Sequence, residues 1–250
     1  MEITDLAMDW YDAGLELHAL QQVHVRNALA GVLSADGKLD ATKMQAIWFP
    51  QIQSDIFLSH SHADTRIAVA LAGWLHVKLG LTCFIDSCAW GYADDLLRAI
   101  DVRYCYLSAS DTYSYEKRNR STSHVHMMLS VALSKMIDSS ECVWFLNTPS
   151  SIAPREVIET GSARTTKSPW LYAELAMTKL IRRRSPAMHR HHVKLARERL
   201  DEAELAILYD VELDHLTSLT RRDLSVWSVA NAASSAAHAL DLLYALKPRD

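Results

Sequence analysis

The chain has 250 residues, of which 49% are hydrophobic and 22% charged, and its formal net charge is −4. These values are ordinary for a protein that folds in water, and the small negative charge gives no overall attraction to nucleic acid or to an anionic membrane, so we expect neither as a partner. The N-terminus shows no basic region followed by an apolar core, and no apolar run approaches the roughly 20 residues that cross a bilayer, so we expect a cytoplasmic protein.

The few glycines and cysteines exclude several kinds of site. The chain has seven glycines and neither a GxGxxG nor a GxxxxGK[ST] pattern, so a tightly held dinucleotide of the Rossmann kind or a P-loop site is not expected. The four cysteines have no CxxC spacing, which favours reduced thiols that fill the core. We predict a protein with no bound cofactor and no metal.

The first part of the chain, residues 1–54, is predicted to be helical. A long helix over 1–33 is followed by a turn at 34–37 and a short helix at 40–47, which ends before Pro50 because proline disfavours the helical conformation of the preceding residue. The apolar residues of the first helix follow a spacing of three and four: Leu6, Trp10, Ala13, Leu17 and Leu20. This segment either packs on the main domain as a helical layer or serves oligomerisation or regulation.

The stretch 55–86 predicts a strand, a helix and a second strand. The apolar run at 56–58 is long enough for a buried strand, and a helical pattern then extends from Asp64 to Gly80, where glycine favours the end of a helix. A second apolar run at 82–85 follows at once. This alternation is typical of a βαβ unit in a parallel sheet.

Polar side chains follow both predicted strands. Ser59 and His60 come directly after the first strand, and Asp86 comes after the second. Because ligands of parallel sheets bind beyond the carboxyl ends of the strands, these residues are candidates for a binding site. A loop is predicted to begin at Ser87, and its Trp90 is expected either to contact a substrate or to fill part of the core.

A helix is predicted over 93–102, and a segment rich in tyrosine and arginine follows at 103–120. Tyrosines interleaved with arginines suit stacking on a base and pairing with phosphate, and the alternative is a polar insertion whose tyrosines pack back on the domain. Ser121 or Ser123 is expected to cap the next helix. The apolar stripe of that helix is expected in the core: Val125, Met128, Leu129, Ala132, Leu133 and Met136.

A third strand is predicted at 142–147, where the run is apolar on both faces, as in a central parallel strand. After a polar loop, Ser168 at the cap and Pro169 at the first position predict the start of a helix. Trp170 and Glu174 are four residues apart in this helix, so they lie on one face.

The C-terminal part predicts a charged helix and loop over 182–204, with a zinc site at its histidines as the alternative. A strand is predicted at 206–209, and a final helix over 223–246. The residues of this last helix that we expect to face inward are Leu224, Trp227, Ala230, Ala237 and Leu240.

Two of these stretches resemble the Toll/interleukin-1 receptor (TIR) domain family. The first is 57–64 together with 83–86, and the second is the start of the helix at 168. There the family pattern has a serine, a tryptophan two residues on, a glutamate four beyond that and then a leucine, which correspond to Ser168, Trp170, Glu174 and Leu175. The resemblance covers residues 55–246, with departures at 103–120 and 148–167.

The resemblance implies a flavodoxin-like parallel sheet with helices on both faces. We accordingly predict a TIR domain over 55–250, preceded by the helical segment 1–54. Bacterial members of the family commonly act in defence against phage, and many self-associate. We therefore expect a bacterial defence protein that self-associates through the TIR domain and the N-terminal helix.

The resemblance also implies an activity. Many bacterial and plant TIR domains cleave the bond between nicotinamide and ribose in NAD, which is then a substrate and not a cofactor, and the glutamate that matches Glu174 is catalytic in them. Such cleavage builds an oxocarbenium-like centre that one carboxylate can stabilise, since nicotinamide leaves as a neutral group. The residues that would contact the substrate are Phe57, Ser59, His60, Asp86, Trp90 and Trp170. The sequence leaves open whether the product is ADP-ribose, a cyclic isomer or another adduct.

Two other functions stay open from the sequence. The first is a TIR interaction module without catalysis, of the kind found in receptor adaptors. The second is an enzyme similar to nucleoside deoxyribosyltransferases, which share the sheet and the use of a glutamate. The combination of Glu174 with Trp170 and an aromatic loop favours an enzyme that acts on NAD.

Overall fold

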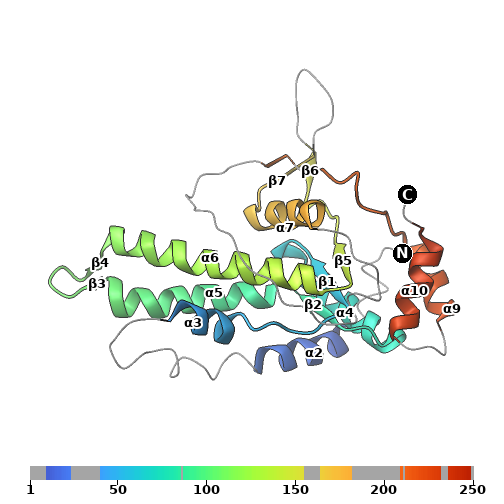
Figure 1. Ribbon diagram of the computed structural model, residues 1–250, viewed down its shortest axis with the longest axis horizontal. Helices are drawn as coiled ribbons and strands as arrows, with labels where there is room; N and C mark the ends of the chain where they lie inside the picture. Colours follow the sequence, from blue (N-terminus) through green and yellow to red (C-terminus); the bar gives the residue numbers. More distant parts are fainter. Residues whose placement is uncertain are drawn as a thin grey trace, which may run out of the picture.

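The computed structural model describes residues 10–23, 40–85, 87–154, 164–181, 209–210, 212–231 and 236–248. A parallel sheet of three strands lies among its helices (Figure 1). The strands are β1 (Ile56–Ser59), β2 (Cys83–Ile85) and β5 (Cys142–Phe145), in the order β2-β1-β5. In the register of the sheet, Phe57 of β1 pairs with Phe84 of β2 and with Val143 of β5. The three strands therefore lie in one parallel sheet, as predicted.

Both faces of the sheet are apolar because helices cover both of them. Neighbouring residues of a strand point to opposite faces. Ile56 and Leu58 of β1 lie in one core cluster with helix α4 (Thr65–Leu79), whereas Phe57 lies in a second cluster with helix α6 (Tyr115–Ser139). The predicted α/β class with a parallel sheet is confirmed.

Four of the described helices contribute to the core on the Ile56 side of the sheet. They are α2 (Tyr11–Val23), α4, α9 (Arg221–Ala230) and α10 (Ala236–Leu246). Trp227 of α9 is fully buried there, with its ring centroid 6.3 Å from that of Trp74 and 6.0 Å from that of Trp144. Three tryptophans from α4, β5 and α9 thus hold the C-terminal helices against the sheet.

The prediction of one helix over 223–246 is wrong, because α10 lies back against α9. The Nε1 atom of Trp227 donates to the carbonyl oxygen of Ala239 at 2.6 Å, whereas twelve residues of a straight helix would separate the two positions by about 18 Å. Ala230, predicted to face inward, is exposed at the end of α9. The apolar spacing of the sequence continues from α9 into α10 and therefore resembles that of a single helix.

The other face of the sheet carries α3 (Ala41–Trp48), α5 (Ser87–Ile100), α6 and α7 (Pro169–Leu180). The short helix predicted at 40–47 is α3, and Asp40 caps it, since its Oδ1 atom accepts hydrogen bonds from the backbone N–H groups of Thr42 and Lys43. The predicted apolar stripe of α6 is buried in the second core cluster.

Helix α5 begins earlier than predicted. It starts at Ser87, so Trp90 lies in the first turn of a helix and not in a loop. Ala93 and Leu96 of this helix are buried in the second core cluster, and Gly91, which costs roughly 1 kcal/mol inside a helix, does not interrupt it.

Helix α6 also begins earlier than predicted. Its N-cap is Ser114, whose Oγ atom accepts a hydrogen bond from the N–H group of Lys117, so the prediction of Ser121 or Ser123 as the cap is wrong. Ser121 lies inside the helix, and its hydroxyl donates to Asp101. None of the described helices, α6 included, is long and apolar enough to cross a membrane.

Helices α5 and α6 extend side by side away from the sheet, and we call this projection the helical arm (Figure 1). A π-helical turn, Asp101–Cys105, continues α5, and the hairpin of β3 (Tyr106–Leu107) and β4 (Thr112–Tyr113) leads to α6. Tyr106, Tyr113 and Tyr115 are 44%, 40% and 81% exposed. These three tyrosines of the predicted insertion therefore do not pack back on the domain.

A second, antiparallel sheet lies beside α7. Its strands are β6 (Ala153–Pro154), β7 (Arg164–Thr166) and β8 (Tyr209–Asp210), in that order. Of the strand predicted at 206–209 only Tyr209 is described, and it pairs antiparallel with Thr166 of β7. The charged segment predicted over 182–204 lies outside the described residues.

Helix α2, the described part of the helix predicted over 1–33, packs directly on α4. Two glycines allow the close approach: a Cβ atom on Gly14 would lie 1.9 Å from the carbonyl oxygen of Val69, and one on Gly73 would lie 2.1 Å from that of Trp10. The guanidinium of Arg66 lies over the ring of Tyr11, with its Cζ atom 5.2 Å from the centroid. This part of the N-terminal segment is therefore a layer on the main domain, and its role in oligomerisation stays a prediction.

Replacing Gly14 with alanine should destabilise the protein by about 1–3 kcal/mol, because the new methyl group forces α2 away from α4. Helix propensity alone would stabilise such a variant by up to about 1 kcal/mol, so the sign of the change identifies the cause. Urea unfolding measures the effect. The control is Glu16→Ala on the exposed side of α2, which should change stability by less than about 0.5 kcal/mol. A Gly14→Ala protein at least as stable as the parent would contradict the close packing.

Candidate functional site

The closest contact between the predicted site residues joins β1 to α7. The hydroxyl Oγ of Ser59 donates a hydrogen bond to Oε2 of Glu174 at 2.6 Å. Both residues are buried, with exposed fractions of 1% and 2%. A short hydrogen bond to a carboxylate in a buried place is among the stronger neutral–charged contacts in proteins. The structure thus brings together two residues that the sequence places 115 positions apart.

Helix α7 owes its position to its first residues. Ser168 is the N-cap, and its Oγ accepts a hydrogen bond from the N–H group of Leu171 at 3.3 Å, while Pro169 occupies the first helical position. Leu171 and Leu175 are buried on the inner side of the helix. With its start and its inner face fixed, the second turn presents Glu174 to the end of β1, as the helix start predicted.

The carboxyl end of β1 is held by polar contacts from the segment after β5. The N–H group of Leu146 donates to the carbonyl oxygen of Ser59 at 2.9 Å. Farther along, the hydroxyl of Thr148 donates to the carboxylate of buried Asp64. The sequence pattern predicted neither Thr148 nor Asp64 as part of this site, because a hydrogen bond between two loops gives no periodic signal in the sequence.

His60 is buried beside Ser59, and its Nδ1 atom lies 3.3 Å from the carbonyl oxygen of Leu58. Trp170 lies one turn before Glu174, and its ring meets the ring of His126 from α6 edge to face, with centroids 5.7 Å apart at an angle of 90°. The sequence did not predict a place for His126 in this site. Its contact with Trp170 joins the start of α7 to α6.

Three other predicted substrate contacts lie elsewhere or outside the described residues. Phe57 of β1 is fully buried in the second core cluster, and its ring centroid lies 5.4 Å from that of Phe84. Trp90 lies in helix α5, and Asp86 lies outside the described residues. Their roles as substrate contacts stay predictions.

Two histidines near the site have lowered pKa values. Burial lowers the pKa of His126 below its ordinary value of 6.5, and the carboxylate of Asp94 opposes this effect. Burial, and after it the imidazole of His60, lowers the pKa of His18 on α2. Both side chains are therefore mainly neutral near pH 7. Among the described residues, no three His, Cys, Asp or Glu side chains are grouped so that they could hold a metal ion.

The chemistry of this arrangement is that of a buried carboxylate fixed at one oxygen by a hydroxyl. Because the carboxylate is already held in place, it can stabilise a positive charge that develops beside it and does not have to reorient first. Comparison of the chain with protein-family models, with curated proteins and with solved structures gave no match. The TIR resemblance therefore rests on the motifs of the sequence alone.

The lowered histidine pKa values predict a loss of stability in mild acid. The unfolded chain takes up a proton at His126 as the pH falls through about 6.5, whereas the folded chain resists it, so the free energy of unfolding should fall between about pH 7 and pH 5. The variant His126→Gln should show a smaller fall, and the exposed His124→Gln should show the fall of the parent. Urea unfolding at the two pH values measures this. An equal fall in the parent and in His126→Gln would contradict the prediction.

Proposed function

We propose that the chain is a TIR-like enzyme that cleaves the bond between nicotinamide and ribose in NAD, with Glu174 as the catalytic carboxylate. The observation that carries this proposal is the hydrogen bond of 2.6 Å from Ser59 to the buried carboxylate of Glu174. It lies at the carboxyl end of a parallel strand, the edge at which ligands of α/β sheets bind.

The strand order also supports a flavodoxin-like sheet. Numbered along the chain, the parallel strands are arranged second, first, third, which is how the flavodoxin-like order begins. The first two strands carry the TIR-like motifs at 57–64 and 83–86, and helix α7 carries the third. The strand order is therefore compatible with the fold that the sequence motifs imply.

The proposed chemistry follows from the charge that the reaction creates. As the bond to nicotinamide breaks, positive charge develops on the ribose, and the Glu174 carboxylate stabilises it. Nicotinamide leaves as a neutral molecule, so no general acid is required. The role of Ser59 is to orient the carboxylate by donating a hydrogen bond to its Oε2 atom.

The assignments to defence against phage, to a cytoplasmic location and to self-association come from the resemblance and belong to this proposal. Water, an internal ring nitrogen or another nucleophile can each accept the ADP-ribosyl unit. The choice among these acceptors decides whether the product is ADP-ribose, a cyclic isomer or another adduct.

The burial of Glu174 favours a second candidate function, a TIR-like interaction module without catalysis. A carboxylate that is only 2% exposed can also serve as a structural tie between β1 and α7. In that case Glu174 would matter for stability and the protein would leave NAD intact. An assay of the purified protein separates the two candidates.

The test measures nicotinamide release from NAD by chromatography, over a range of protein concentrations so that assembled protein is included. Glu174→Gln keeps the size of the side chain and removes its charge, so we expect a loss of rate of about 10²–10³. The control is Glu116→Gln, which alters an exposed carboxylate on α6 that pairs only with Arg120 among the described residues, and it should retain the parent rate. Deoxynucleosides serve as alternative substrates.

Two outcomes would overturn the proposal. One is a folded Glu174→Gln protein, checked by circular dichroism, that consumes NAD at the rate of the parent. The other is a parent protein that leaves NAD intact at every concentration, which supports the interaction module, or that acts on deoxynucleosides instead, which supports the transferase.

A further inference from the structure

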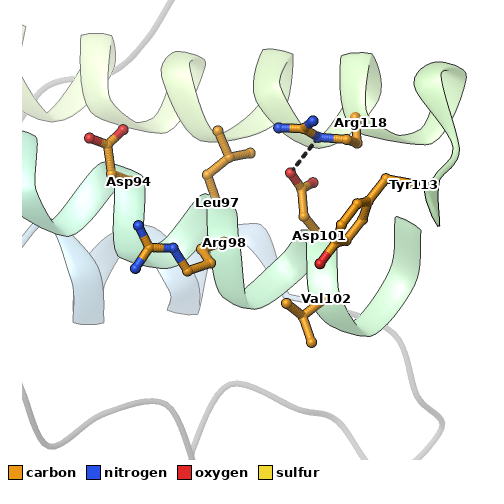
Figure 2. Close-up of a pocket in the computed structure, with 7 residues that line it drawn as sticks. All are labelled: Asp94, Leu97, Arg98, Asp101, Val102, Tyr113 and Arg118. Carbon is orange, nitrogen blue, oxygen red and sulfur yellow. Dashed lines mark hydrogen bonds and ion pairs between the residues drawn. The ribbon is translucent and has the colours of Figure 1, made fainter. Parts of the chain in front are cut away.

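The helical arm, whose far end lies away from the sheet (Figure 1), carries there a pocket of about 320 Å³ between α5 and α6 (Figure 2). Its walls include Asp94 and Arg98 of α5 and Arg118 of α6, and Tyr113 of the hairpin closes one end. Tyr113 and Arg118 come from the segment rich in tyrosine and arginine, for which the proposed NAD chemistry has no use.

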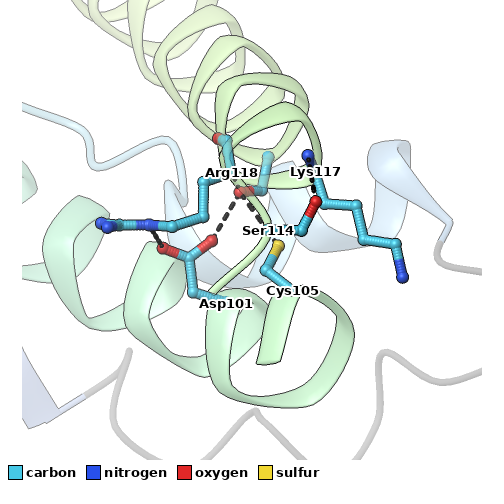
Figure 3. Close-up of polar contacts among 6 residues, drawn as sticks. Asp101, Cys105, Ser114, Lys117 and Arg118 are labelled. Atoms are coloured by element: carbon cyan, nitrogen blue, oxygen red, sulfur yellow. Dashed lines mark hydrogen bonds and ion pairs between the residues drawn. The ribbon is translucent and has the colours of Figure 1, made fainter. Parts of the chain in front are cut away.

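A buried carboxylate fixes the position of Arg118. The Nε atom of Arg118 donates to Oδ2 of Asp101 at 2.8 Å (Figure 3). The hydroxyl of Ser121 donates to Oδ1 of the same carboxylate at 2.6 Å. Asp101 is buried at the start of the π-helical turn, a kind of local widening that is frequent at functional sites. Arg118 is thus held by one of its three guanidinium nitrogens.

The other two nitrogens of Arg118 are available to a ligand. Among the described residues they have no hydrogen-bond partner, and Figure 2 shows them turned toward the side of the pocket where Leu97 lies. Arg98 projects from α5 on the same side, is exposed, and has no ion pair within the described part of the chain. Two guanidinium groups in the lining of one pocket suit a phosphate, which binds arginine through paired hydrogen bonds.

The opposite end of the pocket offers a fixed aromatic ring. Tyr113 is 40% exposed, and the Cζ atom of Arg118 lies 5.7 Å from its ring centroid. The ring of Tyr106 packs against it edge to face, with centroids 5.6 Å apart, and the hydroxyl of Tyr106 donates to Asp111 at 2.7 Å. A ring that is held in this way loses little freedom when a planar ligand stacks on it.

We propose that this pocket binds a nucleoside monophosphate. Its phosphate lies between Arg98 and Arg118, its base stacks beside Tyr113, and the carboxylate of Asp94 accepts a hydrogen bond from a ribose hydroxyl or a base amino group. The volume is at the lower end of the range for ligand pockets, which fits one nucleotide and is small for a dinucleotide such as NAD. The proposal holds whether or not Glu174 cleaves NAD.

Isothermal titration calorimetry with AMP tests the proposal on the full chain, without any turnover of NAD. We expect one site with a dissociation constant below about 1 mM. Adenosine lacks the phosphate and ribose 5-phosphate lacks the ring, so each should bind at least about tenfold more weakly. An absence of saturable binding by AMP, or equal binding of adenosine and AMP, would overturn the proposal.

Matched variants locate the site. Arg98→Gln and Tyr113→Leu should each weaken AMP binding at least about tenfold, since one removes the charge and the other removes the ring. The controls are Arg120→Gln and Tyr115→Leu, which change the same residue types on the same arm outside the pocket. Arg98 is exposed and without an ion pair in the described ranges, so its replacement should leave the fold intact. Unchanged binding in Arg98→Gln and Tyr113→Leu, or an equal loss in the controls, would place AMP elsewhere and refute the assignment.

Discussion

The hydrogen bond between Ser59 and Glu174 ties the central strand to a helix that the chain reaches 115 residues later. A carboxylate buried as deeply as that of Glu174 costs free energy unless polar groups surround it. Ser59 supplies such a group, and it can do so only because the cap at Ser168 starts α7 at a fixed position relative to the sheet. The placement of α7 and the proposed chemistry depend on this one contact.

The helical arm uses the same physical device at a second place. Asp101 is a buried carboxylate whose two oxygens accept hydrogen bonds from Arg118 and Ser121. At the sheet edge the buried carboxylate itself is the proposed reacting group, whereas in the arm it orients an arginine toward a pocket. Burial matched by hydrogen bonds thus fixes both candidate sites, and the core cluster shared by the sheet, α5 and α6 connects them.

Much of the frame around Glu174 could be predicted from local patterns: the three strands from apolar runs that end at polar residues, and α7 from its serine and proline. The early start of α5 could not be predicted, because Gly91 between two aromatic residues is typical of a loop, whereas the structure includes it in the helix. The spacing of apolar residues also failed to predict that α9 and α10 are separate helices. The placement of Ser59 and Glu174 in one site was expected from the strand end, the helix start and the TIR resemblance, although not their direct hydrogen bond. The pocket at Arg118 needed the π-helical turn, which has no signal in the sequence.

A double-mutant cycle on Ser59 and Glu174 tests the central contact most directly. Urea unfolding of Ser59→Ala, Glu174→Leu and the double variant gives the coupling between the two side chains. We predict that the double variant is less destabilised than the sum of the single variants, by about 1–3 kcal/mol. The control cycle pairs Glu174→Leu with Ser225→Ala, an exposed serine on α9, and should be additive. Additivity within about 0.5 kcal/mol for Ser59 and Glu174 would contradict the contact on which the proposed site is built.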